Sequence, residues 1–337
     1  SKRERRDVSI QRFIENHFWL FLMLGMLIGF IFPGQAIVLD RFVIVLLMML
    51  LYVVFLKIDL ASIIGHIKRP FLLVYLLVCN LLVTPVLVYA CTWKLDPDLR
   101  LAVVLLACLP SGTAAPALTD IVKGKASLTL VLTILSSMIA PLSITGLFYV
   151  LYHTAISLDY TRLFLGLVAF TLVPLAASQL SKRLFGPAIE RCKRHFGALS
   201  VLIMMLIVMA VIGKEADYIR SNIRDIFGIL LVLYAVFFAF QVVGYFQAFW
   251  LEPEERIAVS VSKMAMNNVL GVVIAISYFN PQIALILVLS EIPWNTMPIL
   301  YSFILKLHRK PDAAAGKRGS AKREGAGTPG ADVKHGR

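Results

Sequence analysis

The sequence predicts an all-α integral membrane protein with about ten transmembrane helices. Hydrophobic residues make up 59% of the 337-residue chain, charged residues make up 16%, and the mean hydropathy is +0.82. A soluble domain carries about 25% charged residues, so this composition excludes that class. The apolar runs also lack the strict polar and apolar alternation of an outer-membrane barrel, which leaves helices as the spanning elements.

The spans follow from run length, because a helix needs about 20 apolar residues to cross the hydrocarbon core. Charged or Pro/Gly-containing connectors separate the runs, and the first and seventh are short. The predicted spans are 18–32, 37–56, 71–93, 99–122, 127–152, 163–180, 199–212, 226–250, 257–279 and 283–305.

Orientation follows from lysine and arginine, which are retained on the cytoplasmic side of short loops. This rule places three basic segments in the cytoplasm: SKRERR at the start, residues 182–194 and the tail from Lys306. Both termini are therefore predicted to be cytoplasmic. The acidic loop EPEER, residues 252–256, is the exception. The net charge of +13 is attributed to topology and anionic lipid and not to nucleic acid. Short loops and a basic tail suit a bacterial inner membrane.

The ten runs divide into two sets of five near Asp159. An odd number of spans per half would place the halves in opposite senses, as an inverted repeat. The predicted organisation is a basic N-terminus at 1–17, one five-helix repeat at 18–155, a second inverted repeat at 160–306, and a disordered basic tail at 307–337.

Two spans carry breaks in corresponding positions. The fourth contains LPSGTAAPALTD, residues 109–120, and the ninth contains SKMAMNN, residues 262–268. Unwound backbone at membrane depth is costly unless protein or a water-filled cavity covers it. Paired breaks indicate a binding site near the membrane midplane; the alternative is that the prolines only kink a packed helix.

Two charges are predicted to lie deep in the membrane. Lys263 follows Glu254 by nine residues, or about 13 Å along a helix, and Glu291 reaches a similar depth on the next span. Intramembrane charges usually pair or face a cavity. The hypothesis is a Lys263–Glu291 pair that titrates during transport, and the alternative is a permanent salt bridge. Asp120 is expected at the inner interface.

No nucleotide, haem or hydrolase motif occurs, and the four cysteines have no metal-ligand spacing. No cofactor, metal site or enzyme activity is therefore predicted.

Residues 107–142 and 261–300 resemble the fourth, fifth, ninth and tenth helices of the bile acid/sodium symporter family. The resemblance implies a panel domain, formed by spans one, two, six and seven, and a core domain with broken, crossing helices 4 and 9. It also implies two sodium ions behind the crossing and an organic anion between the domains.

The resemblance and the deep polar residues together select one set of candidate substrate- or ion-binding residues: Asn80, Gly112, Thr113, Ala115, Pro116, Thr129, Thr133, Lys263, Met266, Asn267, Asn268, Glu291 and Asn295. Ala115 and Pro116 replace the family's usual serine–asparagine pair and offer no side-chain oxygen. Lys263 replaces the glutamate that both sodium sites share. An ammonium there would repel sodium and occupy its ligands.

The predicted function is therefore transport of a small organic anion by alternating access without sodium, either coupled to protons or as a uniporter. The alternatives are a sodium-coupled symporter, a carrier of the arsenite-efflux type in which Cys108 would contribute, and an uncoupled channel-like or sensory membrane protein.

Overall fold

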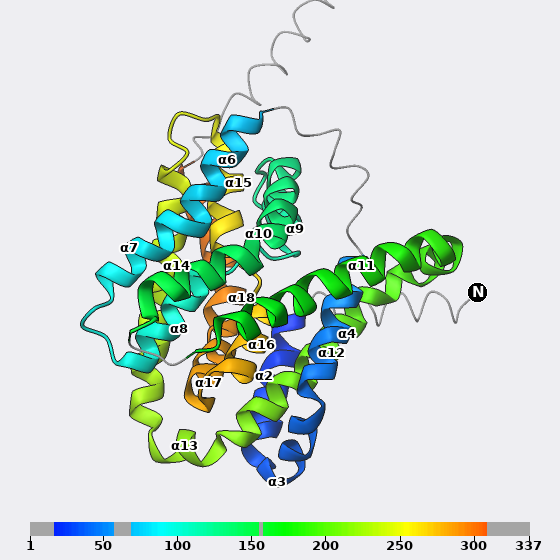
Figure 1. The fold of residues 1–337 in the computed structure, drawn as a ribbon, viewed down its shortest axis with the longest axis vertical. Coiled ribbons are helices and arrows are strands. Elements are labelled where there is room, and N and C mark those ends of the chain that lie inside the picture. The colour runs from blue at the N-terminus through cyan, green and yellow to red at the C-terminus, as the bar shows by residue number, and fades with distance from the viewer. Residues whose placement is uncertain (1–16, 57–68, 155–157, 309–337) are drawn as a thin grey trace, which may run out of the picture.

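The computed structural model describes residues 17–56, 69–154 and 158–308, which are helical apart from short turns and one isolated β-bridge (Figure 1). The predicted N-terminal segment lies outside the described residues except for His17. The predicted tail also lies outside them beyond His308.

The helices of the first half are α2 (Phe18–Ile31), α3 (Pro33–Ala36), η1 (Ile37–Phe42), α4 (Val43–Leu56), α6 (Pro70–Val78), η2 (Cys79–Val83), α7 (Thr84–Cys91), α8 (Pro97–Cys108), α9 (Ala115–Ile121) and α10 (Ala126–Tyr152). Those of the second half are α11 (Tyr160–Cys192), η3 (Lys193–His195), α12 (Phe196–Lys214), α13 (Ala216–Ser221), α14 (Ile223–Phe246), α15 (Pro253–Met264), α16 (Asn268–Tyr278), α17 (Pro281–Leu289) and α18 (Glu291–His308).

Five helical stretches are long and apolar enough to cross a membrane: Pro33–Leu56, Pro70–Cys91, Ala126–Tyr152, Tyr160–Lys214 and Ile223–Phe246. The protein is therefore an all-α, multi-pass membrane protein. The other predicted spans fall on shorter helices. The predicted tenth span, 283–305, falls on α17 and α18, which meet at Ser290. Helical hydrogen bonds continue across this point, from the Ser290 N–H to the Ile286 carbonyl and from the Trp294 N–H to the Ser290 carbonyl.

Helices α2, α4, α11 and α12 form one group, in which α2 packs along α12 and α4 packs against both α11 and α12. Gly25 and Gly29 of α2 permit the close approach to α12. A Cβ at Gly29 would lie 2.5 Å from the carbonyl oxygen of Met209, and one at Gly25 would lie 2.8 Å from that of Met205. This is the small-xxx-small spacing that lets membrane helices approach closely.

Gly29→Ala is expected to lower the free energy of unfolding by about 1–3 kcal/mol, because α2 must move away from α12 to admit the methyl group. Gly146→Ala is the matched control, since nothing lies within 4 Å of a Cβ there and alanine favours a helix interior. Thermal unfolding in detergent would measure both variants. A Gly29→Ala variant as stable as Gly146→Ala would contradict this packing.

A second group surrounds α8, which is buried at every residue from Leu101 to Cys108. Helices α7, α10, α16 and α17 pack against it, and α15 lies between α14, α10 and α9. This group contains both interrupted helices, so it positions the candidate site (Figure 1).

Candidate functional site

The two predicted breaks contact each other inside the protein. The α8–α9 break pairs with the α15–α16 break through an antiparallel bridge between Ser111 and Met266. The Gly112 N–H donates to the Ala265 carbonyl at 2.7 Å, and the Asn267 N–H donates to the Pro110 carbonyl at 2.8 Å. The unwound segments thus satisfy each other's backbone groups, which offsets the cost of breaking two helices in an apolar setting.

Glycine is required at the crossing. A Cβ at Gly112 would lie 2.9 Å from the carbonyl oxygens of both Ala265 and Met266. Those atoms are backbone and cannot rotate away, so a side chain at position 112 would separate the paired breaks. Thr113 is half-buried in the same turn, while Ala115 and Pro116 begin α9 and present no side-chain oxygen.

Lys263 lies one residue before the end of α15 and is only 3% exposed. Its ammonium donates to the Asn80 carbonyl at 2.9 Å and to the Ala107 carbonyl at 2.6 Å. It also lies 5.2 Å from the centroid of the Phe240 ring. The side chain therefore joins α15 to η2 and to the end of α8.

The Ala107 carbonyl is free for Lys263 because α8 ends there. In a continuous helix it would accept from the Ser111 N–H, but that group donates to the Ser136 hydroxyl at 3.2 Å. The last carbonyls of a helix carry the negative end of its dipole. Lys263 therefore caps the C-terminus of α8 with a positive charge.

The Asn80 carbonyl is free for a different reason. It lies in the π-helical turn η2, where the Thr84 N–H donates to Cys79. The next possible donor is Pro85, which has no N–H. The sequence CNLLVTP thus leaves one buried carbonyl for an external donor, and Lys263 supplies it.

The hypothesised Lys263–Glu291 pair is wrong. Among the ion pairs of the described residues none joins Lys263 to a carboxylate. Glu291 is buried at the start of α18, where the Asn295 amide donates to its backbone carbonyl at 2.6 Å and lies 3.5 Å from its carboxylate. Matching depth did not predict contact, because the Lys263 ammonium donates to the Asn80 and Ala107 carbonyls, whereas the Glu291 carboxylate lies beside the Asn295 amide.

The fifth-helix hydroxyls predicted from sequence both lie at the crossing. Thr133 bonds the Ser111 hydroxyl at 3.0 Å and donates to the Gly112 carbonyl at 3.4 Å. Thr129 bonds the Thr119 hydroxyl at 2.9 Å and donates to the Ala258 carbonyl at 3.3 Å. Both hydroxyls are therefore engaged with the interrupted helices.

The remaining predicted residues lie in the α15–α16 break or at the start of α16. The Asn267 side chain accepts from the Leu270 N–H and caps α16, and the Asn268 amide donates to the Ser290 hydroxyl at 3.0 Å. The Met266 carbonyl accepts from the indole of Trp294 at 2.9 Å. Asp120, by contrast, is exposed.

Sequence reasoning missed four polar residues of the site. Gln247 donates to the Asn80 side chain at 2.9 Å, so that amide does not face Lys263. Ser111, Ser136 and Ser262 line a cavity of about 10 Å³ beside Lys263. The available signals were a serine inside each break and a serine one helical turn after Thr133.

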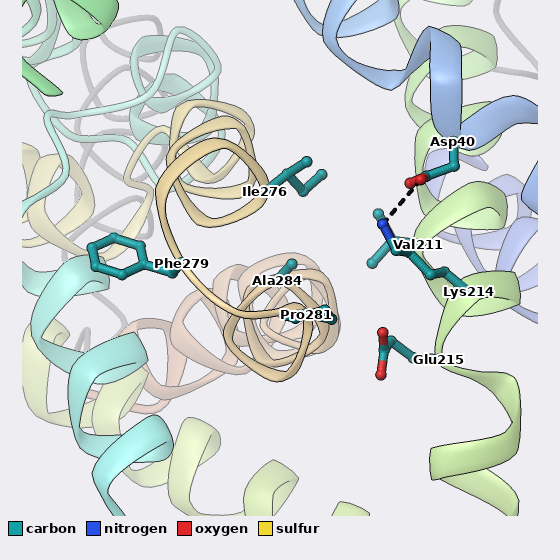
Figure 2. A pocket seen from close by; sticks show the side chains of 8 residues that line it. All are labelled: Asp40, Val211, Lys214, Glu215, Ile276, Phe279, Pro281 and Ala284. Carbon is teal, nitrogen blue, oxygen red and sulfur yellow. Dashed lines mark hydrogen bonds and ion pairs between the residues drawn. The ribbon is translucent and has the colours of Figure 1, made fainter. Parts of the chain in front are cut away.

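A larger cavity of about 40 Å³ lies elsewhere, between η1 and α12 on one side and α16 and α17 on the other (Figure 2). Lys214 pairs with Asp40 there at 2.9 Å, and Glu215 lies just past the end of α12. Burial raises the pKa of Glu215 above its ordinary value, Asp40 adds to this, and Lys214 opposes it.

Glu215→Gln is expected to become progressively more stable than the wild type as pH rises from 4 to 7. A raised pKa means that the folded state favours the protonated carboxyl of Glu215, so protonation stabilises the folded wild type fully below the unfolded-state pKa of about 4.3. This contribution to the wild type is lost as pH rises through the folded-state pKa of Glu215. Thermal midpoints of the two proteins across this range would measure the effect, and a difference independent of pH would contradict it.

Interrupted helices that pair their breaks inside an apolar helical bundle are the arrangement of secondary transporters, and the fold and site place this protein in that class. The model of the Sodium Bile acid symporter family matches residues 43–222, more than half of the chain. The chain therefore belongs to this family, as the sequence resemblance predicted.

Three curated relatives are similar to the chain. The "Uncharacterized sodium-dependent transporter YocS" of Bacillus subtilis is 20% identical, over 81% of this chain and 85% of the relative. The "Arsenical-resistance protein Acr3" of Alkaliphilus metalliredigens is 25% identical, over 77% of this chain and 81% of the relative. The "Probable sodium/metabolite cotransporter BASS1, chloroplastic" of Arabidopsis thaliana is 23% identical, over 59% of this chain and 50% of the relative. The protein is thus a membrane transporter of the bile acid/sodium symporter type.

Proposed function

We propose that this protein transports a small organic anion by alternating access and without sodium coupling. The observation that carries the proposal is the buried ammonium of Lys263, bonded to the Asn80 and Ala107 carbonyls beside the crossing. Sodium requires oxygen ligands of this kind. Here a covalently attached cation already uses them.

The proposed architecture has ten spans with both termini in the cytoplasm of a bacterial cell, arranged as inverted repeats at 18–155 and 160–306. The group α2, α4, α11 and α12 is the proposed panel, and the group around α8 is the proposed core. The separate packing of the two groups supports this division, and alternating access would move one group against the other.

The hydroxyls that a sodium ion would need are also occupied. Thr129 and Thr133 bond other hydroxyls and carbonyls, and Ala115 and Pro116 provide no side-chain oxygen. A sodium ion at this place would have to displace Lys263 or these bonds. Sodium coupling is therefore the less favourable mechanism, although the printed names of YocS and BASS1 refer to sodium for those proteins.

The proposed substrate is a small carboxylate or sulfonate that enters between the two groups. The N-terminus of α16 begins at the crossing, and the positive end of its helix dipole favours an anion. Trp294 and Asn295 of α18 lie beside the α15–α16 break and are the proposed lining residues. Glu291 is buried without a basic partner among the described residues and is the proposed proton-carrying group if transport is proton-coupled.

The first test is the thermal stability of the purified protein in detergent, with sodium titrated against potassium as the chloride salts at constant ionic strength. Binding to the folded state must raise the unfolding temperature. We expect no sodium-specific rise for the wild type and a saturable rise of several degrees for Lys263→Glu. Lys94→Glu, at an exposed position outside the site, is the matched control and should resemble the wild type.

A sodium-specific rise in the wild-type protein would overturn the proposal and favour an ordinary sodium symporter. Saturable counterflow of a carboxylate in proteoliposomes would support a carrier, whereas conductance without saturation would indicate a channel.

Transport of arsenite is the second candidate function, favoured by the similarity to Acr3 and by Cys108, which is fully buried at the end of α8 next to Ala107. Arsenite resistance conferred on a sensitive host by the wild type and lost in Cys108→Ser would favour it over the organic anion.

A further inference from the structure

The cavity of about 10 Å³ beside Lys263 is built as a polar site inside the core. Its polar lining consists of Ser111, Ser136, Ser262 and Lys263, and its other walls are the leucines at positions 77, 81, 109 and 132, with Asn80. The volume is close to the minimum that one water molecule needs, so any occupant is a single small species. An organic substrate is far too large for it.

No carboxylate in the described part of the chain neutralises the charge of Lys263. No carboxylate forms an ion pair with it among the described residues, and its two acceptors are neutral carbonyls. A buried charge without a counter-charge is costly. An ammonium has three donors, so a third remains for another acceptor.

Ser262 provides an independent observation. Its residue is 3% exposed, and its hydroxyl lacks a hydrogen-bond partner within the described part of the chain. A buried hydroxyl without a partner usually indicates an absent acceptor or water. Since Ser262 and Lys263 line the same cavity, both unused donors face one small space.

The other hydroxyls of the cavity already use their protons. Ser136 donates to the Thr133 carbonyl at 3.1 Å and accepts from the Ser111 N–H. Thr133 donates to the Gly112 carbonyl, so the Ser111 hydroxyl donates to Thr133. The unused donors are therefore those of Lys263 and Ser262, which suit an anion, and the leucine walls strengthen its attraction to the ammonium.

We infer that this cavity binds a single chloride-sized inorganic anion, held by Lys263 and Ser262, at the place where the family resemblance puts sodium. A positive lysine with a bound anion would replace the family's negative glutamate with bound sodium, so the core would still contain a neutral pair of charges. The inference rests on the proposed role of Lys263 as the cation of the site. It does not depend on which substrate is transported.

The test compares chloride with gluconate at constant sodium and ionic strength, measured as the unfolding temperature of the full-length protein in detergent. A bound anion should produce a saturable rise of several degrees in the wild type, and bromide should substitute for chloride. Ser262→Ala should shift the half-saturating chloride concentration upward by about tenfold, since a hydrogen bond to a charged group contributes about 1.5–3 kcal/mol. Lys263→Gln should remove the response.

Equal unfolding temperatures in chloride and gluconate for the wild type would overturn the inference and leave a water molecule as the occupant. The same result would follow if Ser262→Ala responded to chloride as the wild type does, because the salt would then act nonspecifically. A sodium-specific effect at constant chloride would overturn the proposed function instead, so the two failures are distinguishable.

Discussion

Lys263→Met is expected to lower the free energy of unfolding by about 2–4 kcal/mol. The methionine keeps most of the apolar stem but removes the donor that satisfies the Asn80 and Ala107 carbonyls. Each buried acceptor left without a partner costs about 1–3 kcal/mol, and relief from burying an unpaired charge returns part of that loss. Neither carbonyl has another donor available, because Pro85 lacks an N–H and the Ser111 N–H bonds Ser136.

Thermal or denaturant unfolding of the purified variant would measure this loss. Lys214→Met is the control, since its ammonium is 40% exposed and pairs with Asp40 near the surface. Such pairs contribute about 0–1 kcal/mol. If Lys263→Met were as stable as the wild type, the ammonium would contribute no net stability, which would contradict its role as a cap on α8.

The interrupted helices could be predicted from sequence because their signals are local. Pro110, Gly112 and Pro116 lie close together, and proline and glycine disfavour a continuous helix wherever the chain folds. The paired breaks of residues 109–120 and 262–268 were therefore expected, and they are observed at α8–α9 and α15–α16. The division at Ser290 also has a local signal, since Pro293 lacks the N–H that the Leu289 carbonyl would accept from, but run length alone predicted one span there.

The partners of the charged residues could not be predicted in the same way. Depth along a helix follows from counting residues, but the direction of a side chain depends on how helices pack. Lys263 and Glu291 have similar depth and different surroundings, which is why an ion pair was expected and carbonyl contacts were found. The sequence signal for the Asn80 contact was Pro85, which has no N–H to donate to the Asn80 carbonyl.

The acidic loop 252–256, which was the exception to the predicted orientation, is explained by the tertiary contacts of Glu255. Glu255 lies in the first turn of α15, and its side chain is 7% exposed. Lys125 donates to it at 2.8 Å and Arg69 at 3.3 Å. The acid is thus neutralised by bases that precede α6 and α10, and it ties α6, the α9–α10 turn and α15 together within the proposed core.

The double variant Arg69→Ala/Lys125→Ala is expected to lower the free energy of unfolding by about 3 kcal/mol, whereas Glu255→Gln should cost about 1 kcal/mol. The asymmetry follows from burial. The double variant leaves a buried carboxylate with only the N-terminus of α15 to stabilise it, whereas Glu255→Gln leaves two bases whose side chains are 62% and 47% exposed and can be hydrated. Adding Glu255→Gln to the double variant should therefore recover most of the lost stability, as measured by unfolding in detergent.

A triple variant no more stable than the double variant would show that the long side chains of Arg69 and Lys125 act through apolar packing. Restoration would show that charge compensation holds these three elements in one rigid unit against which the panel can move.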